Sequence, residues 1–156
     1  TPYVIGAMEY AKELGARVVG LTCCPGSEVD RFADIGISPM PGPEVIAGST
    51  RMKSGTAQKM VLNMLSTGVM IKLGKVYGNL MVDVKATNEK LTQRAVSIVC
   101  TAVGTDERAA RDTLVQCGFS AKTAILMLLC GVNAKQAEAL LASHGGRIAD
   151  VIENRI

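Results

Sequence analysis

Aromatic residues are scarce in this 156-residue sequence, where they make up 3% of the chain and tryptophan is absent. Surfaces that bind single-stranded nucleic acid use aromatic side chains as stacking platforms, so that class of protein is not indicated. The net charge is only +3 at pH 7, and no run of lysine and arginine stands out. Nucleic acid is therefore not predicted as a partner. With 48% hydrophobic residues, the chain can still bury an aliphatic, methionine-rich core.

Cysteine and histidine patterns typical of disulfide cross-links or metal sites are missing as well. The five cysteines are odd in number and form no C-x-x-C pair, and there is a single histidine. A disulfide framework or a structural zinc site is not indicated, and no metal is predicted. Free thiols among apolar neighbours fit the reducing cytoplasm.

Long apolar runs are also missing. Residues 60–73 come closest to a membrane span, but they are interrupted by Asn63, Ser66, Thr67 and Lys72. No signal peptide pattern is present. We therefore predict a cytoplasmic protein without a membrane partner.

The first forty residues alternate between helical and strand-like patterns. Residues 2–14 predict a helix, with Thr1 as N-cap and Pro2 at the first helical position. Residues 16–24 form a β-branched run typical of a buried parallel strand, and 35–40 predict a second strand after a short helix capped by Ser27. This is the rhythm of a layered α/β domain. It has few strands and begins at a helix cap, so we expect the C-terminal portion of a longer protein.

One long amphipathic helix is predicted over residues 50–73, followed by a mostly irregular connector over 74–91. Short helices broken by Gly or Asn come next, one of them with Thr105 as the expected N-cap. We therefore predict an α/β domain with its connector over 1–90 and a small all-helical module over 91–156.

The stretch "GSTRMKSGTAQK" places Ser49, Thr50, Arg51 and Lys53 at the start of the long helix. A helix N-terminus has unpaired N–H groups and a partial positive charge, which favour an anion. The hydroxyls can donate to phosphate oxygens, Arg51 can bind two oxygens at once, and Lys53 adds positive charge. The residues alone leave a second interpretation open, in which Thr50 is a simple cap and the two cations are solvated.

Other candidate groups are weaker. Glu9, Glu13, Glu28 and Glu44 show no pairing typical of an acid/base couple, and Glu44 can belong to a simple turn. His144 follows a helix and fits a C-terminal cap or a surface position better than a catalytic base. No nucleophile elbow, P-loop or dinucleotide fingerprint is present.

The segment "GPEVIAGSTRMKSGTAQKMVLNMLSTGVMIKLGKVYGNLMVDVKATNEKL" resembles the signature of the bacterial N-acetylmuramic acid 6-phosphate etherases. The resemblance covers essentially the whole chain and is densest over residues 41–94. It implies part of a flavodoxin-like SIS (sugar isomerase) domain followed by a small all-helical module. The run "CGFSAKTAILMLLCGVNAKQAEALLASHGG" is similar to a ubiquitin-associated module, which the resemblance implies to be structural here.

The activity implied by the resemblance is lyase-type cleavage of the D-lactyl ether of N-acetylmuramic acid 6-phosphate. The products are N-acetylglucosamine 6-phosphate and D-lactate, in the recycling of cell-wall amino sugars. The family uses no metal and no cofactor. A carboxylate removes the proton beside the aldehyde of the opened ring, lactate leaves, and water adds to the double bond. The acid/base glutamates are expected upstream of Thr1, so this chain is expected to contain no catalytic residue and to be inactive alone.

Substrate-binding residues are implied by matching the motif position by position. Thr50 and Arg51 match sugar-phosphate contacts, with Ser49 beside them and Lys53 adding positive charge. Thr1 matches the last hydroxyl of the family's phosphate loop. Lys90 matches a position that reaches the active site, from the same subunit or its partner. The intact protein is expected to be a homodimer, with the helix over 50–73 as a candidate interface.

Three alternatives remain open from the sequence. The SIS fold also serves a non-catalytic sugar-phosphate sensor, the animal glucokinase regulatory protein, which is a more distant relative. Sugar-phosphate isomerases use the same fold. The helical tail can also be a protein-binding module in its own right.

Overall fold

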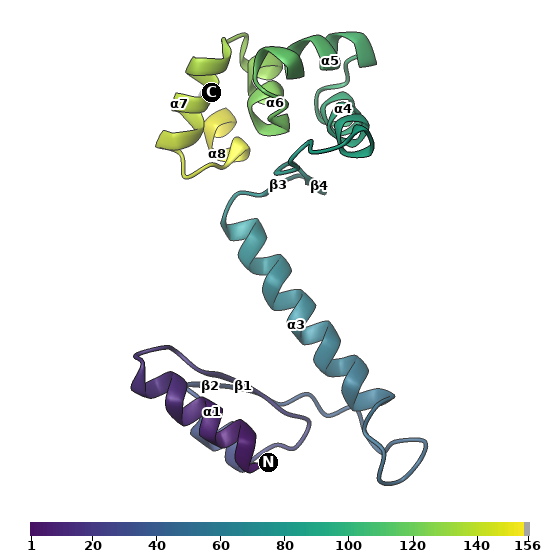
Figure 1. The fold of residues 1–156 in the computed structure, drawn as a ribbon, viewed down its shortest axis with the longest axis vertical. Helices are drawn as coiled ribbons and strands as arrows, with labels where there is room; N and C mark the ends of the chain where they lie inside the picture. The colour runs from purple at the N-terminus through teal and green to yellow at the C-terminus, as the bar shows by residue number, and fades with distance from the viewer. Residues whose placement is uncertain (155–156) are drawn as a thin grey trace. The chain divides into compact units, whose positions relative to one another are not determined.

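The computed structural model describes residues 1–154 and divides into two compact units, Thr1–Ser66 and a second that begins at Thr67. Each unit is described by itself (Figure 1). The first holds α1 (Pro2–Glu13), β1 (Val19–Leu21), α2 (Glu28–Phe32), β2 (Ile35–Ile37) and most of α3 (Lys53–Lys72). The second holds β3 (Val76–Tyr77), β4 (Leu80–Met81), α4 (Glu89–Val103), α5 (Glu107–Gln116), α6 (Ala121–Cys130), α7 (Ala134–Ser143) and α8 (Ile148–Glu153).

The first unit contains the predicted order of helix, strand, helix and strand. β1 and β2 pair in parallel, with Gly20 opposite Gly36. Each strand is three residues long, shorter than the ranges 16–24 and 35–40 that the sequence predicts. Ser27 caps α2 as predicted, and its hydroxyl accepts a hydrogen bond from the Asp30 amide at 3.4 Å.

Two strand glycines allow α2 to lie close against the sheet. A Cβ at Gly20 would stand 2.8 Å from the Ala33 Cβ and from the Val29 carbonyl oxygen. A Cβ at Gly36 would meet the end of the Asp30 side chain, which can turn away. A side chain at Gly20 would push the backbone of α2 away from the strands, so packing requires a glycine at that position.

Helix α1 is tied to the sheet by Asp34. The Asp34 carboxylate accepts a hydrogen bond from the Val18 amide at 2.7 Å and lies 3.5 Å from the Lys12 ammonium group. Lys12 also donates to the Phe32 carbonyl at 2.6 Å. The hydrogen bond from the Val18 amide, with the positive charge of Lys12, outweighs the effect of burial and holds the pKa of Asp34 below its ordinary value.

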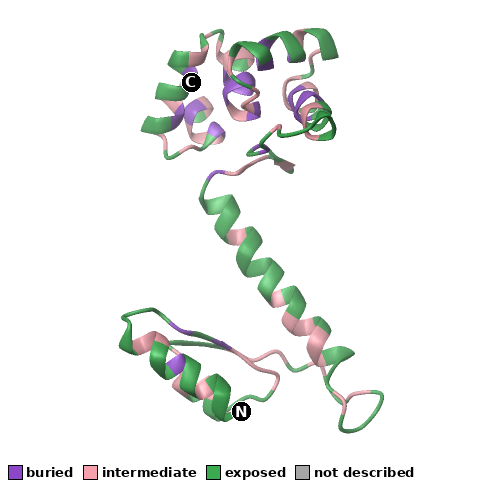
Figure 2. Cartoon of the chain, in the orientation of Figure 1, coloured by how far each residue is buried: buried purple, intermediate pink, exposed green. Residues whose placement is uncertain are grey.

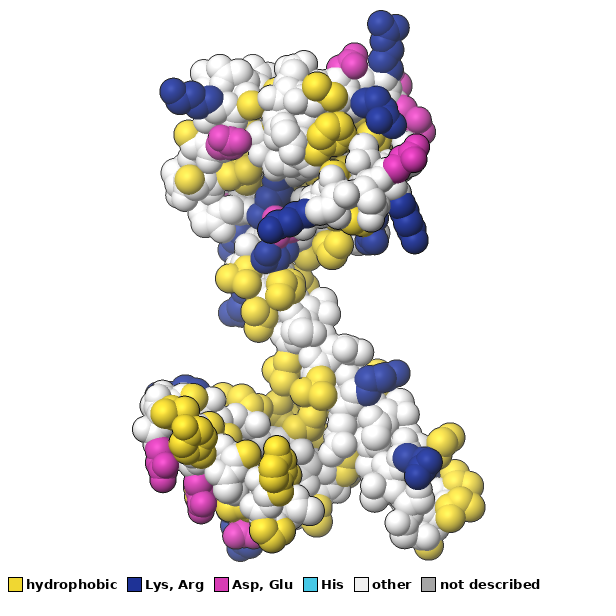
Figure 3. All heavy atoms as spheres, viewed as in Figure 1, with side chains coloured by type: hydrophobic (Ala, Val, Ile, Leu, Met, Phe, Trp, Pro, Cys, Tyr) yellow, Lys and Arg dark blue, Asp and Glu magenta, His cyan; other side chains and the backbone are white. Residues whose placement is uncertain are grey.

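Helix α3 buries none of its residues. Large apolar side chains remain on its surface, where Figure 3 shows them along the helix. They are Met60, Leu62, Met64, Leu65, Val69, Met70 and Ile71. The predicted apolar pattern is therefore present, but the described residues cover it only in part, since Ala57, Val61 and Gly68 are half-buried.

The segment predicted as a mostly irregular connector over 74–91 is mostly irregular, but it also contains two short strands that the sequence did not predict. β3 and β4 form an antiparallel hairpin in which Tyr77 lies opposite Leu80. Gly78 has φ 56°, which permits the tight turn between the strands. Val82, 1% exposed, then enters the helical core. Strands of two residues carry too little periodicity to be recognised in a sequence.

The second unit holds the principal core, seen as the purple residues of α4 to α8 in Figure 2. Its fully buried side chains include Leu114, Ile125 and Leu126. Asp106, rather than the predicted Thr105, caps α5, because its carboxylate accepts from the Ala109 amide at 2.9 Å. A carboxylate is the stronger acceptor for the exposed amides of a helix start.

Within residues 1–154, no single helix is both long and apolar enough to cross a membrane. The pair α5 and α6 reaches the required length and composition only when taken together, and it is bent by 111°.

Candidate functional site

The start of α3 is held by a carboxylate nine residues earlier in the chain. Glu44 accepts hydrogen bonds from the backbone amides of Lys53 and Ser54, each at 3.0 Å and each through a different oxygen. These two bonds hold the pKa of Glu44 below its ordinary value. The first amides of the helix therefore already have an anionic partner, supplied by the protein.

This arrangement corrects two expectations. The helix begins at Lys53, so Thr50 lies three residues before it and is not its cap. The carboxylate of Glu44 takes that role. The two amides that the sequence offered to a phosphate group are also occupied, which leaves side chains to supply the binding groups.

Three of the predicted binding residues on this stretch lie next to one another on the loop that enters α3, and Lys53 is the first residue of the helix. Thr50, Arg51 and Lys53 are exposed, and Ser49 is half-buried. The loop turns tightly here, because the Ser49 amide donates to the Ile46 carbonyl at 3.2 Å and the Gly55 amide donates to the Thr50 carbonyl at 2.9 Å. The hydroxyls and the guanidinium group are thus available to an anionic ligand.

The other two predicted residues are placed differently. Thr1 belongs to the same unit and stands at the N-cap of α1, but its side chain makes no capping hydrogen bond. It is exposed. Lys90 lies in the second unit, exposed, at the second residue of α4.

Hydroxyl groups also gather at the carboxyl ends of the two parallel strands. Thr22 directly follows β1, and its hydroxyl accepts from the Cys24 amide at 3.1 Å. Ser38 directly follows β2, and its hydroxyl oxygen is buried without a hydrogen-bond partner among the described residues. The Cys23 thiol donates to the Ser54 carbonyl at 3.8 Å. The start of α3 therefore lies near the carboxyl ends of the parallel strands, which is where open α/β sheets bind ligands.

Sequence reasoning missed Ser38 and the role of Glu44. The signal for Ser38 was its position immediately after a predicted strand, the edge at which α/β proteins place polar groups. Glu44 had no comparable signal, because a cap formed across nine residues depends on the path of the intervening loop.

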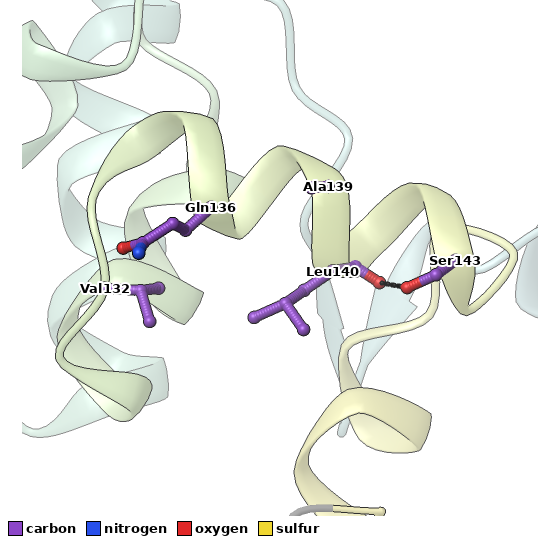
Figure 4. Close-up of a pocket in the computed structure, with 5 residues that line it drawn as sticks. All are labelled: Val132, Gln136, Ala139, Leu140 and Ser143. Carbon is purple, nitrogen blue, oxygen red and sulfur yellow. Dashed lines mark hydrogen bonds between the residues drawn. The ribbon is translucent and has the colours of Figure 1, made fainter.

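Two hollows lie in the second unit, apart in sequence from the predicted binding loop. One, of about 330 Å³, is lined by residues 82–87 and 118–121. The other, of about 360 Å³, runs along α7 (Figure 4). Its lining residues are Val132, Gln136, Ala139, Leu140 and Ser143. None of these five side chains is charged, so this hollow offers little to a phosphorylated ligand.

The single histidine lies near this second hollow. His144 ends α7, and its Nδ1 lies 2.9 Å from the Leu140 carbonyl oxygen and 3.0 Å from the Ser143 hydroxyl. The predicted position at a helix C-terminus is confirmed. Among residues 1–154, no group of three His, Cys, Asp or Glu side chains has the placement of a metal site.

Models of two protein families match the chain. The SIS domain matches residues 1–68, and the C-terminal lid domain of glucokinase regulatory protein matches residues 78–123. The predicted SIS domain is thereby confirmed. The second match describes the start of the helical module as a lid domain.

Curated relatives match almost the entire chain. N-acetylmuramic acid 6-phosphate etherase of Aliivibrio fischeri strain MJ11 is 56% identical over 155 residues, 99% of this chain and 52% of that protein. The protein of the same name from Escherichia coli O7:K1 strain IAI39 is 55% identical over 153 residues, 98% of this chain and 51% of that protein. The chain thus spans about half the length of these relatives. The resemblance of this chain to the N-acetylmuramic acid 6-phosphate etherases, as a sequence family, is confirmed over nearly its whole length.

Proposed function

We propose that this chain supplies part of an N-acetylmuramic acid 6-phosphate etherase, a carbon–oxygen lyase of amino-sugar recycling. The intact enzyme would release D-lactate and N-acetylglucosamine 6-phosphate. The observation that carries the proposal is the identity of 54–56% with proteins of that name over 99% of the chain. The available hydroxyls and guanidinium group at the start of α3 support it, because they suit a phosphorylated sugar.

In this proposal the side chains of Ser49, Thr50 and Arg51 hold the sugar phosphate, and Lys53 contributes positive charge. Thr1 supplies a further hydroxyl. The glutamates that move protons belong to a part of the enzyme outside this sequence, and neither a metal nor a cofactor takes part.

The proposal extends to the organisation of the chain. Residues 1–90 would be the SIS portion with its connector, and 91–156 a helical module of ubiquitin-associated type with a structural role. Lys90, at the border, would reach the substrate from this subunit or its partner. The enzyme would be a cytoplasmic homodimer in which the exposed apolar side chains of α3 contribute to the subunit interface.

The test is an assay for D-lactate. It uses a longer protein that contains this 156-residue segment and is as long as the curated relatives. Incubation with N-acetylmuramic acid 6-phosphate should release D-lactate and N-acetylglucosamine 6-phosphate in equal amounts. Binding without release of either product would contradict the proposal, and so would formation of an isomerised sugar phosphate.

A second candidate is a non-catalytic sugar-phosphate sensor, favoured by the match of residues 78–123 to the lid domain of glucokinase regulatory protein. Such a protein would keep the phosphate-binding side chains and lack the proton-transferring glutamates. The same assay separates the two candidates, because a sensor would bind the sugar phosphate and leave the ether bond intact.

A further inference from the structure

Glu44 and the first turn of α3 form a closed loop that contains the proposed substrate-binding side chains. The carboxylate bridges nine residues to the Lys53 amide and ten to the Ser54 amide, at 3.0 Å in each case. Residues 45–48, between the two ends, are exposed, with Val45 at 76% and Ile46 at 68%. The position of Ser49, Thr50 and Arg51 thus depends on how firmly the loop is joined at its base.

The same contact restricts how an anion can bind. Hydrogen bonds from amides to a carboxylate are charge-assisted and stronger than those to a neutral acceptor. A phosphate group could use these two amides only by displacing a carboxylate that already satisfies them and repels it. The phosphate is therefore directed to the hydroxyl and guanidinium side chains of the loop.

We propose that Glu44 is a positioning residue for substrate binding, which fixes the loop bearing Ser49, Thr50 and Arg51 by joining its base to α3. This role rests on the proposed function, because it concerns the binding of the same sugar phosphate. Glu44 touches no reacting atom, and it acts on affinity through Arg51 and the two hydroxyls.

A purely structural cap would behave differently. Removing such a cap would lower the thermal stability of the protein and leave the contribution of Arg51 to substrate affinity intact. A positioning residue is coupled to Arg51, so that removing Arg51 abolishes most of what Glu44 contributes. A double-mutant cycle measures this coupling directly.

The experiment uses the protein with the length of its curated relatives and four variants: Glu44→Gln, Arg51→Ala, the double variant, and Glu13→Gln as control. Glu13 is an exposed glutamate of the same unit. Glu44→Gln loses the charge and one of the two oxygen acceptors, so KM should rise about tenfold while kcat stays within about threefold. In the Arg51→Ala background the same change should raise KM less than about threefold.

Three further measurements keep folding separate from positioning. The melting temperature of each variant must lie well above the assay temperature, and Glu44→Asp, which keeps the charge on a shorter side chain, should recover part of the affinity. Amide hydrogen exchange at Lys53 and Ser54 should accelerate in Glu44→Gln. Equal effects of Glu44→Gln on KM with and without Arg51, or an unchanged KM, would overturn the positioning role. A wild-type protein that releases no D-lactate would overturn the proposed function instead, together with the role that depends on it.

Discussion

Arg51 is the residue on which the proposed phosphate site depends most. Its guanidinium group is exposed at the entry to α3 and can form two parallel hydrogen bonds with one phosphate group. In the protein with the length of its relatives, Arg51→Ala should weaken substrate binding by about 1.5–3 kcal/mol, the scale of hydrogen bonds to charged groups. Calorimetric titration with N-acetylmuramic acid 6-phosphate measures the change.

Arg31→Ala is the matched control for this prediction, because Arg31 is an exposed arginine of α2 in the same unit. Its removal should leave the affinity within about twofold, since surface charges away from a ligand contribute little. Equal losses in both variants would point to a general effect of positive charge, and an unchanged affinity in Arg51→Ala would remove the phosphate assignment.

Asp34 gives a prediction for the dependence of stability on pH. The bond from the Val18 amide lowers its pKa in the folded state, so its stabilisation is fully present above the unfolded pKa of about 3.9. It is lost as the pH falls through the lower, folded pKa. Asp34→Asn should therefore lower the melting temperature of the first unit at pH 7, and the difference should shrink steadily below about pH 4.

The measurement follows backbone amide signals of the first unit during thermal unfolding at several pH values. Glu13→Gln, an exposed carboxylate of α1, is the control and should follow the wild-type curve. A difference between Asp34→Asn and wild type that is independent of pH would assign the effect to packing rather than to ionisation.

At the scale of elements, the sequence predicts the two long helices closely, the short elements of the first unit in their order but not their extent, and the β3–β4 hairpin not at all. The helix predicted over 50–73 is observed over Lys53–Lys72, and the one over 2–14 over Pro2–Glu13. Their patterns repeat over several turns, which makes the period recognisable. The β3–β4 hairpin and the Glu44 cap depend on contacts between residues that no local period connects. At the site, Ser49, Thr50 and Arg51 lie together on the loop before α3, whereas Thr1 and Lys90 lie on other elements. That Glu44 occupies the first amides of α3 could be seen only in the structure.

Helices α3 and α6 both have apolar faces, but the structure places them in opposite environments. Leu126 of α6 is fully buried, whereas Met64 of α3 is 61% exposed. In the 156-residue chain, Leu126→Ala should destabilise the second unit by about 2–5 kcal/mol, because it removes buried contacts and leaves a cavity. Met64→Ala should change the stability by less than about 0.5 kcal/mol.

Urea unfolding of the two variants measures this difference, with a midpoint and slope fitted for each unit, because Met64 lies in the first unit and Leu126 in the second. If Met64→Ala lowered the free energy of unfolding as much as Leu126→Ala does, the apolar side chains of α3 would have to be covered already in the 156-residue chain. The same change in the longer protein is expected to cost more, since the proposed dimer interface would cover α3 there.

The two units differ in how much apolar surface they bury. In the first unit, among the described residues, the buried hydrophobic side chains are Met8 and Val18. The second unit holds the continuous cluster from Val82 to Val151. Burial of apolar surface is the main favourable contribution to folding. The first unit therefore has little intrinsic stability, and α1 and α3 offer apolar surface that a further part of the protein or another subunit could cover.

Hydrogen exchange by mass spectrometry tests this difference across the whole molecule. In the 156-residue chain, peptides from α1 and the β1–β2 sheet should exchange within seconds to minutes, while peptides from α4 and α6 stay protected far longer, because local opening follows the amount of buried contact. In the protein with the length of its relatives, the same first-unit peptides should become protected, and the second-unit peptides should change little. Slow exchange of the first unit in the 156-residue chain would show that its few buried residues are enough to keep it folded and protected. Fast exchange in both proteins would show that the first unit stays open in the longer protein as well.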